Sequence, residues 1–200
     1  MDSLLTRCFL CGAQSELLPH LTARICRACF ALLSSRGGGP LGPEHHVPAD
    51  RIVDHLFLGP ERAAVSAEYL AAEGIGRVLV ISDTSRAYFR DDPRVEYLII
   101  ELDDAPGESL LDVLPRAMAF MQPAPPRPGS FGPNCLVHCV SGMSRSAALI
   151  IAYVMRTQGR GYEEALALVR ARRPVVCPNP GFARQLRSLE PIQTAQRRND

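Results

Sequence analysis

Residues 137–146 read VHCVSGMSRS and join two apolar segments of different character. The segment that leads into this stretch, 135–138, is a short β-rich run. The segment that leads out of it, 146–158, is apolar on nearly every side, as in a buried helix. A strand that passes through a short loop into a helix meets the unpaired N–H groups and the positive dipole end of that helix. The stretch therefore predicts an anion-binding site between a strand and a buried helix.

Outside this stretch, apolar β-rich runs alternate with helical patterns. Continuous runs at 77–82 and 97–100 predict strands that are buried on both faces. Apolar residues at helical spacing follow in three further segments, 110–121, 162–169 and 182–189. Strands and helices that alternate at crossover length predict an α/β fold, with a central, mostly parallel sheet flanked by helices.

Three side chains within 137–146 suit the chemistry of an anion site. Gly142 lets the loop bend where a Cβ would obstruct it, and Arg145 offers a planar charged fork that matches two phosphate oxygens. Cys139 lies at the base of this electropositive turn, where a thiol pKa falls from ~8.5 into the ~3.5–7.5 range. The thiolate is then a nucleophile that forms a phosphocysteine intermediate. The plain alternative is a buried structural cysteine beside an unrelated arginine.

The pattern His138-Cys139, five residues, Arg145-Ser146 resembles the signature of the protein tyrosine phosphatase superfamily, and its Ser-Arg-Ser ending resembles the dual-specificity branch. The resemblance extends over residues 50 to 190 and includes the runs 50–60 and 173–186. It implies the fold of that superfamily and a metal-free hydrolysis of phosphotyrosine and phosphoserine or phosphothreonine in proteins. Ser141 departs from the pattern, because many relatives carry alanine there, but it is small enough to fit the same loop.

The resemblance also implies roles for the residues of the site. Cys139 is the nucleophile, and Ser146 assists its sulfur as the leaving group, with helix capping as a competing role. His138 orients the loop and Asn179 helps to fix it, and His138 is not expected to be the general base. Phosphate is expected to bind to the loop residues Val140, Ser141, Gly142, Met143, Ser144 and Arg145.

Phosphoryl transfer also requires a proton donor for the leaving group. Relatives use an aspartate on a loop upstream of the cysteine, and the same residue then activates water. Asp103 and Asp104 both follow the 97–100 run. Their spacing from that run and from the 110–121 helix favours Asp104, with Asp103 as the alternative. Asp112 is expected to cap the helix, which would leave Pro115 in the first turn.

The first 33 residues contain two Cys-x2-Cys pairs, Cys8 with Cys11 and Cys26 with Cys29. Four such thiolates suit tetrahedral, structural Zn²⁺, which supplies folding free energy to a segment too small for a core. A redox pair or unrelated thiols are the alternatives, and His20 could replace one ligand. The predicted domain organisation is a zinc-binding module, a Gly/Pro-rich linker, a catalytic domain and a polar tail, at 1–33, 34–50, 51–190 and 191–200.

Composition narrows the classes of partner. The formal net charge of +1 gives no overall field that would attract nucleic acid or a membrane surface. The chain does not begin with a basic-then-apolar leader, and its longest apolar run, 147–155, is too short to span a bilayer. We expect a cytoplasmic or nuclear protein with reduced thiols. Its expected partners are a phosphoprotein substrate and a further protein bound by the zinc module, without nucleic acid or membrane.

Two other functions remain open at this stage. One is an adaptor that reads phosphate groups with little turnover. The other is a phosphatase for a non-protein substrate such as an RNA end or a glycan, although the loop resembles those branches less. Cys135 and Cys177 are expected to be buried apolar residues, with a reversible disulfide to oxidised Cys139 as the alternative.

Overall fold

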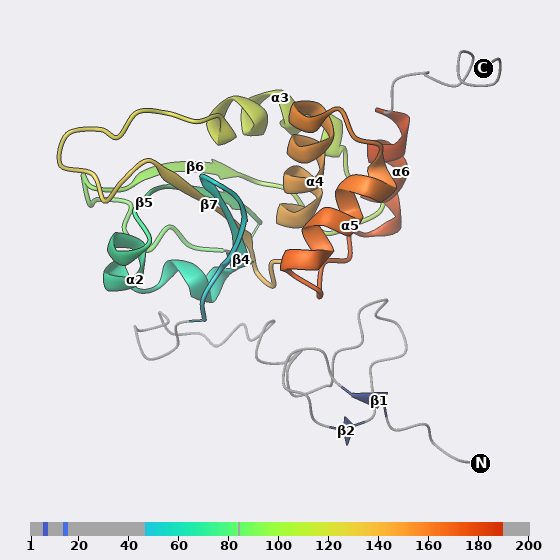
Figure 1. Cartoon of the computed structure of the whole chain (residues 1–200), viewed down its shortest axis with the longest axis horizontal. Coiled ribbons are helices and arrows are strands. Elements are labelled where there is room, and N and C mark those ends of the chain that lie inside the picture. The colour runs from blue at the N-terminus through green and yellow to red at the C-terminus, as the bar shows by residue number, and fades with distance from the viewer. Residues whose placement is uncertain (1–5, 8–13, 16–46, 84, 190–200) are drawn as a thin grey trace.

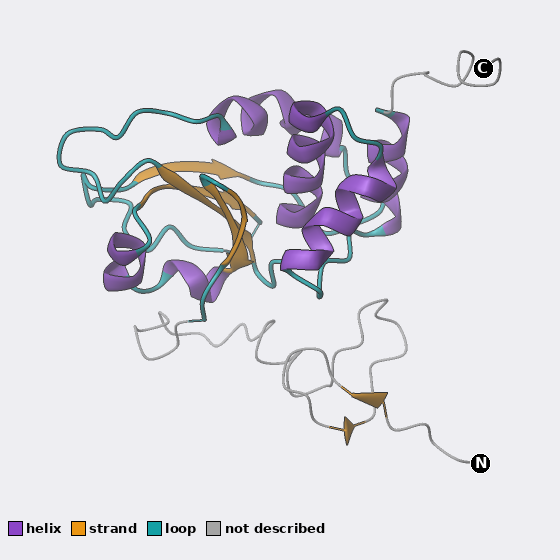
Figure 2. Cartoon of the chain, in the orientation of Figure 1, coloured by secondary structure: helices purple, strands orange, loops and turns teal. Residues whose placement is uncertain are grey.

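A five-stranded sheet forms the centre of the protein, in a computed structural model that describes residues 6–7, 14–15, 47–83 and 85–189 (Figures 1 and 2). The strands in spatial order are β3 (Asp50–Val53), β4 (Leu56–Pro60), β7 (Asn134–Cys139), β5 (Ile75–Ile81) and β6 (Glu96–Ile100). The pairings β4–β7, β7–β5 and β5–β6 are parallel, and only β3 runs antiparallel to its neighbour within this sheet. The predicted α/β fold with a mostly parallel sheet is confirmed, and the antiparallel edge makes the sheet mixed.

The run at 77–82 forms the buried interior strand β5 as predicted, whereas the run at 97–100, also expected to be buried on both faces, lies in the edge strand β6, where only Ile100 is buried. Every residue of β5 is buried, and β7 is buried from Cys135 onward. Such strands show no alternation because helices cover both faces of the sheet. The segment 50–60, which forms part of the family resemblance, is a hairpin in which Asp54 and His55 make the turn between β3 and β4.

Helices cover the two faces of the sheet unequally (Figure 1). One face carries the short 3₁₀ helix η2 (Glu61–Ala64) and α2 (Ala67–Ala72), which enclose the smaller apolar cluster. The other face carries the larger cluster and the remaining described helices, α3 (Leu110–Met121), α4 (Arg145–Gln158), α5 (Tyr162–Arg172) and α6 (Pro180–Ser188). Helix α4 is the core of this layer, since it is buried continuously from Arg145 to Met155.

The start of α3 differs from the prediction. Ser109 is the N-cap, and its hydroxyl accepts a hydrogen bond from the N–H of Asp112 at 3.4 Å. Asp112 therefore lies inside the first turn and is not the cap. Its negative charge there interacts favourably with the positive end of the helix dipole. Pro115 consequently lies beyond the first turn and leaves the carbonyl of Leu111 without its usual helical donor.

Two short strands near the N-terminus, β1 (Thr6–Arg7) and β2 (Gln14–Ser15), pair in antiparallel fashion. The predicted zinc ligands, Cys8, Cys11, Cys26 and Cys29, lie outside the described residues. The same holds for residues 34–46 of the predicted linker and for the predicted tail, 191–200. Among the helices that the structure describes, none is long and apolar enough to cross a membrane.

Candidate active site

The loop between β7 and α4 forms a turn at the carboxyl edge of the parallel strands, which is where open α/β sheets bind ligands. Gly142 has a φ of +66°, a left-handed conformation that favours glycine. A Cβ at this position would also collide with the carbonyl group of Gly59. The loop is joined to the end of β4 by a 3.1 Å hydrogen bond from Glu61 N–H to the carbonyl of Val140. These contacts fix the predicted phosphate loop against the neighbouring strand.

Cys139 is the last residue of β7 and its side chain is buried at the base of the loop. Its sulfur accepts hydrogen bonds from Ser146 Oγ at 3.2 Å and from the N–H of Gly142 at 3.3 Å. Burial alone would raise the pKa of this thiol. The positive charge of Arg145 and the hydrogen bonds outweigh burial, so the pKa lies below its ordinary value.

Arg145 is held by one side of its guanidinium. Its Nη1 donates to Asp83 Oδ1 at 2.9 Å, to the carbonyl of Leu102 at 3.0 Å and to Ser82 Oγ at 3.4 Å. Its Nε is buried and has no hydrogen-bond partner among the residues described. A buried N–H of a charged group is costly to leave unpaired, so this N–H is available to donate to a bound ligand such as a phosphate oxygen.

The two candidate proton donors face different partners. Asp104 Oδ1 accepts hydrogen bonds from Ser144 Oγ at 2.6 Å and from Asn179 Nδ2 at 2.9 Å. Asp103 instead lies beside Asp83, the carboxylate that holds Arg145. The structure therefore connects Asp104 directly to the phosphate loop.

Asn179 connects the phosphate loop, Asp104 and the start of α6. Its N–H donates to Ser144 Oγ at 2.9 Å, and its Oδ1 caps α6 through the N–H of Phe182 at 3.0 Å. The expectation was that Asn179 fixes the phosphate loop. The structure places its backbone on that loop and its side-chain amide on Asp104, so it aligns the loop and the carboxylate together.

Arg173 is the site residue whose role the sequence did not reveal. It is 6 % exposed, and it donates from Nε to the carbonyl of Gly142 at 2.9 Å and from Nη2 to that of Ser141 at 3.1 Å. Its Nη1 pairs with Asp50 Oδ2 at 2.8 Å. Carbonyls drawn outward by Arg173 leave the N–H groups of the same loop free to face an anion. The only feature of the sequence that marks Arg173 is its place between the apolar helical pattern of 162–169 and Pro174.

His138 is buried on β7, and its Nδ1 lies 3.3 Å from the carbonyl oxygen of Cys139. Burial lowers the pKa of His138 to about 4, so the ring is neutral at pH 7. A neutral ring at this place orients the end of the strand and adds no positive charge to the site.

The other described cysteines differ in their relation to Cys139. Cys135 lies on the same strand, four residues away, which separates their Cα atoms by about 13 Å. A disulfide needs Cα atoms within ~7 Å, so Cys135 cannot trap Cys139 without refolding of β7. Burial raises the pKa of Cys135 to about 12, which makes it an unreactive core residue. Cys177 is partly exposed, and its N–H donates to the carbonyl of Met143 at 2.8 Å.

Comparison with known proteins agrees with this geometry. Residues 56–192 match the family model described as the dual specificity phosphatase catalytic domain. Human dual specificity protein phosphatase 22 is 35 % identical over 149 residues, which cover 74 % of this chain and 77 % of that protein.

Two solved structures extend the comparison to the fold. The crystal structure of human DUSP28 has a TM-score of 0.63 and 38 % identity, covering 72 % of this chain and 95 % of the other. That of human tyrosine phosphatase-like serine/threonine/tyrosine-interacting protein has a TM-score of 0.61 and 34 % identity, covering 71 % and 95 % respectively.

Proposed function

Because the chain belongs to the dual-specificity phosphatase family and is a cysteine-dependent phosphatase, we propose that it removes phosphate from phosphotyrosine and from phosphoserine or phosphothreonine side chains of proteins. The observation that carries this proposal is that the Cys139 sulfur and a buried N–H of Arg145 without a partner among the described residues belong to the same loop. The sulfur of Cys139 lies in a turn of N–H donors, and the buried Nε of Arg145 lacks a partner in the described part of the chain.

The first chemical step is phosphoryl transfer to sulfur. The Cys139 thiolate attacks phosphorus in line with the bond to the substrate oxygen, while Arg145 and the loop N–H groups bind the non-bridging oxygens. The P–O bond to the substrate breaks as the S–P bond forms. Asp104 gives its proton to the departing oxygen, and its Oδ1 is held by Ser144 and Asn179 during the transfer.

The second step returns the enzyme to its starting state. Asp104, now a carboxylate, takes a proton from water as the water oxygen attacks phosphorus. The S–P bond breaks, and inorganic phosphate and the thiolate are released. Ser146 donates its 3.2 Å hydrogen bond to the leaving sulfur, which stabilises the negative charge that forms there.

Arg145 is the single cationic side chain between residues 138 and 146. One permanent cation and a turn of N–H donors match the charge of a single phosphate monoester. This supports phosphorylated side chains of proteins over highly charged substrates such as polyphosphorylated lipids.

The decisive experiment uses phosphotyrosine and phosphothreonine peptides with reduced protein in the presence of EDTA. Wild type should release phosphate from both, and Cys139→Ser should release none while it still binds a phosphate analogue. Cys135→Ser is the matched control, because Cys135 is a buried cysteine of the same strand that lies away from the loop. Binding without turnover in folded wild type would instead support the phosphate-reading adaptor.

We infer that Cys8, Cys11, Cys26 and Cys29 hold a structural Zn²⁺ ion that stabilises a small N-terminal module. The support is the two Cys-x2-Cys pairs in a segment too short for an apolar core. Elemental analysis of purified protein should give about one zinc per chain, and Cys8→Ser/Cys11→Ser should remove it. Wild-type protein without zinc would refute this inference and leave the phosphatase mechanism unaffected.

A further inference from the structure

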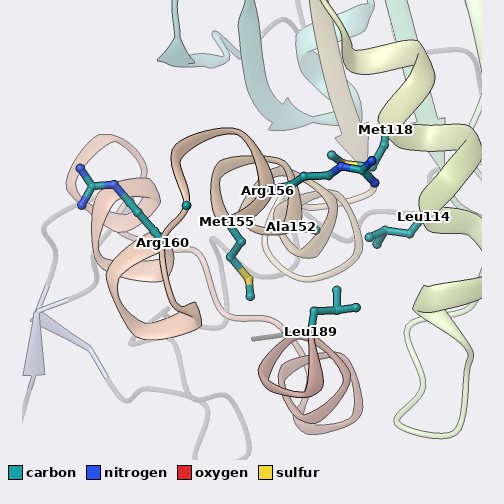
Figure 3. Close-up of a pocket in the computed structure, with 8 residues that line it drawn as sticks. Leu114, Met118, Ala152, Met155, Arg156, Arg160 and Leu189 are labelled. Atoms are coloured by element: carbon teal, nitrogen blue, oxygen red, sulfur yellow. The ribbon is translucent and has the colours of Figure 1, made fainter. Parts of the chain in front are cut away.

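A groove of about 320 Å³ lies at the far end of α4 from the phosphate loop (Figure 3). We call it the α3–α4 groove. Its lining residues are Leu114 and Met118 of α3, Ala152, Met155 and Arg156 of α4, and Gly159, Arg160 and Leu189. In Figure 3 the side chains of Leu114, Met155 and Leu189 point into one shared space. The floor of the groove is therefore apolar.

The groove gathers apolar side chains that the protein leaves in water. In the part of the chain that the structure describes, the large hydrophobic residues classed as exposed are Leu189, at 43 %, and Leu111, at 37 %. Leu189 lines the groove directly. Leu111 precedes Leu114 and Met118 by three and seven residues on α3, and these spacings fall on one helix face. The apolar floor thus continues along α3 beyond the cavity itself.

Two cations flank this apolar floor. Arg156 and Arg160 extend to opposite sides of the groove (Figure 3). Neither makes an ion pair within the described ranges, and the recorded partner of Arg160 is the amide oxygen of Gln158 at 3.0 Å. By contrast, the nearby Arg187 pairs with Glu163 at 2.7 Å. The rim therefore presents positive charge that this surface does not neutralise.

The groove is separate from the catalytic machinery. Arg145 opens α4 at the phosphate loop, whereas Met155 and Arg156 lie ten and eleven residues further along the helix. At 1.5 Å per residue this places the groove about 15 Å from the loop. A ligand in the groove can hold a second protein without covering Cys139.

We propose that the α3–α4 groove docks a segment of a partner protein in which apolar side chains are flanked by carboxylates, as on one face of an acidic amphipathic helix. The apolar anchors would cover Leu111, Leu114 and Leu189, and the carboxylates would pair with Arg156 and Arg160. Helix-in-groove recognition uses this combination of apolar anchors and charged flanks.

The nearest competing occupant is residues 190–200 of the chain itself, which follow Leu189 directly. Their sequence, EPIQTAQRRND, contains one large apolar residue, Ile192, and two arginines. Glu190 and Asp200 offset these two arginines, so the segment offers a single apolar anchor and no net negative side-chain charge, and charge complementarity favours an acidic partner.

Methyl NMR of full-length protein tests the proposal, because the chain has only five methionines. Met118 and Met155 line the groove, Met143 lies in the phosphate loop and Met121 is buried in the core. The probe is a synthetic amphipathic helical peptide with leucines at i, i+3 and i+7 and glutamates on its flanks. It should shift the methyl signals of Met118 and Met155 and leave Met143 unchanged.

Charge variants distinguish specific docking in the groove from non-specific binding of the peptide. Arg156→Glu/Arg160→Glu should weaken peptide binding at least tenfold and leave aryl phosphate hydrolysis unchanged. The matched control, Arg90→Glu/Arg127→Glu, makes the same change in net charge on loops outside the groove and should bind the peptide as wild type does.

Four outcomes would overturn the proposal. The first is no shift of Met118 or Met155 at millimolar peptide, and the second is equal binding of the same peptide with lysine in place of glutamate. The third is that Ile192→Asp alone shifts both methyl signals, since the chain's own residues would then be the occupant. The fourth is a concentration-dependent dimer in sedimentation that Arg156→Glu/Arg160→Glu abolishes, since the occupant would then be a second copy.

Discussion

The hydroxyl of Ser144, in the phosphate loop, donates a 2.6 Å hydrogen bond to the carboxylate of Asp104, which lies forty residues earlier in the chain. Asn179 donates to the same carboxylate oxygen and also binds Ser144 through its backbone. Asp104, the proposed proton donor, is thus held by a residue of the loop that is proposed to bind phosphate. Movement of either group displaces the other, so binding and proton transfer share one framework.

Replacement of Asp104 tests its role as the proton donor. Asp104→Asn should lower kcat for a phosphotyrosine peptide about 10²- to 10⁴-fold, because the leaving oxygen then departs without a proton. An activated aryl phosphate, whose leaving group needs little protonation, should lose much less. Steady-state kinetics on both substrates provides the measurement. Asp103→Asn is the control, and a larger loss in that variant would reverse the assignment.

Arg173 should act as a positioning residue for the phosphate loop. Arg173→Met removes the two donors to the carbonyls of Ser141 and Gly142 and leaves Asp50 without its partner. We expect kcat/KM to fall about tenfold to a hundredfold and the free energy of unfolding to fall by about 2 kcal/mol. Kinetics and urea unfolding should be measured on the same preparations.

The control for Arg173 is Asp50→Asn, which keeps an acceptor for the same donor while the charge is removed. Asp50 is 41 % exposed at its side chain, so its loss of charge is screened by solvent. Asp50→Asn should therefore cost much less than Arg173→Met in both measurements. A shift of the acid limb of the pH–rate profile in Arg173→Met, without a matching loss of stability, would identify positioning rather than folding as the main effect.

The phosphate loop should tolerate a side chain at Gly142 far less than the end of α4 does at Gly159. Both glycines are left-handed, with φ of +66° and +62°. A Cβ on Gly159 meets no atom within 4 Å, whereas one on Gly142 meets the carbonyl group of Gly59. Gly159→Ala should cost about 1 kcal/mol of stability and preserve turnover. Gly142→Ala should abolish turnover, and equal effects in the two variants would contradict the packing argument.

The lowered pKa of Cys139 predicts fast alkylation below the pH at which ordinary thiols react. A pKa below the usual value leaves more thiolate at pH 7, and the rate falls only as the pH drops through that lowered pKa. Ser146→Ala removes a hydrogen bond to the sulfur, so its pKa should rise and the profile should move to higher pH. Peptide mapping after iodoacetate treatment at several pH values gives the rate at Cys139 alone.

Inorganic phosphate supplies the control for that experiment. It should protect Cys139 from iodoacetate, because we expect both anions to bind beside Arg145, whose buried Nε has no partner in the described part of the chain. Cys135, buried and with its pKa raised to about 12, should remain unmodified throughout. An alkylation rate at Cys139 that phosphate does not lower would argue against an anion site at the loop.

The features that could be predicted from the sequence are those formed by residues close to one another in the chain. The run from 135 to 158 is contiguous, so its apolar pattern, its glycine and its Cys-x5-Arg spacing predicted β7, the loop and α4. Asp104 was favoured because it lies between two recognisable elements. Arg173, in contrast, donates to two carbonyls of the loop and pairs with Asp50, 123 residues away, and contacts between such distant residues leave no local pattern in the sequence.

Two other differences have the same physical origin. Ser109 caps α3 because its backbone is extended there, while Asp112 carries an equally suitable side chain three residues later. Asp83 accepts a hydrogen bond from Arg145, which follows a different strand. Nothing in the sequence distinguishes Asp83 from the other polar residues that follow strands. In both cases the choice between similar side chains depends on tertiary geometry that a single sequence does not display.

Rapid acid quenching of the enzyme during turnover of an aryl phosphate, followed by mass spectrometry of its peptides, would identify the residue that carries the phosphoryl group. We expect one phosphoryl group on the peptide that contains Cys139, and neither a phosphoryl group nor turnover in Cys139→Ser. A phosphoryl group on another residue, or undiminished turnover in Cys139→Ser, would contradict the thiolate mechanism.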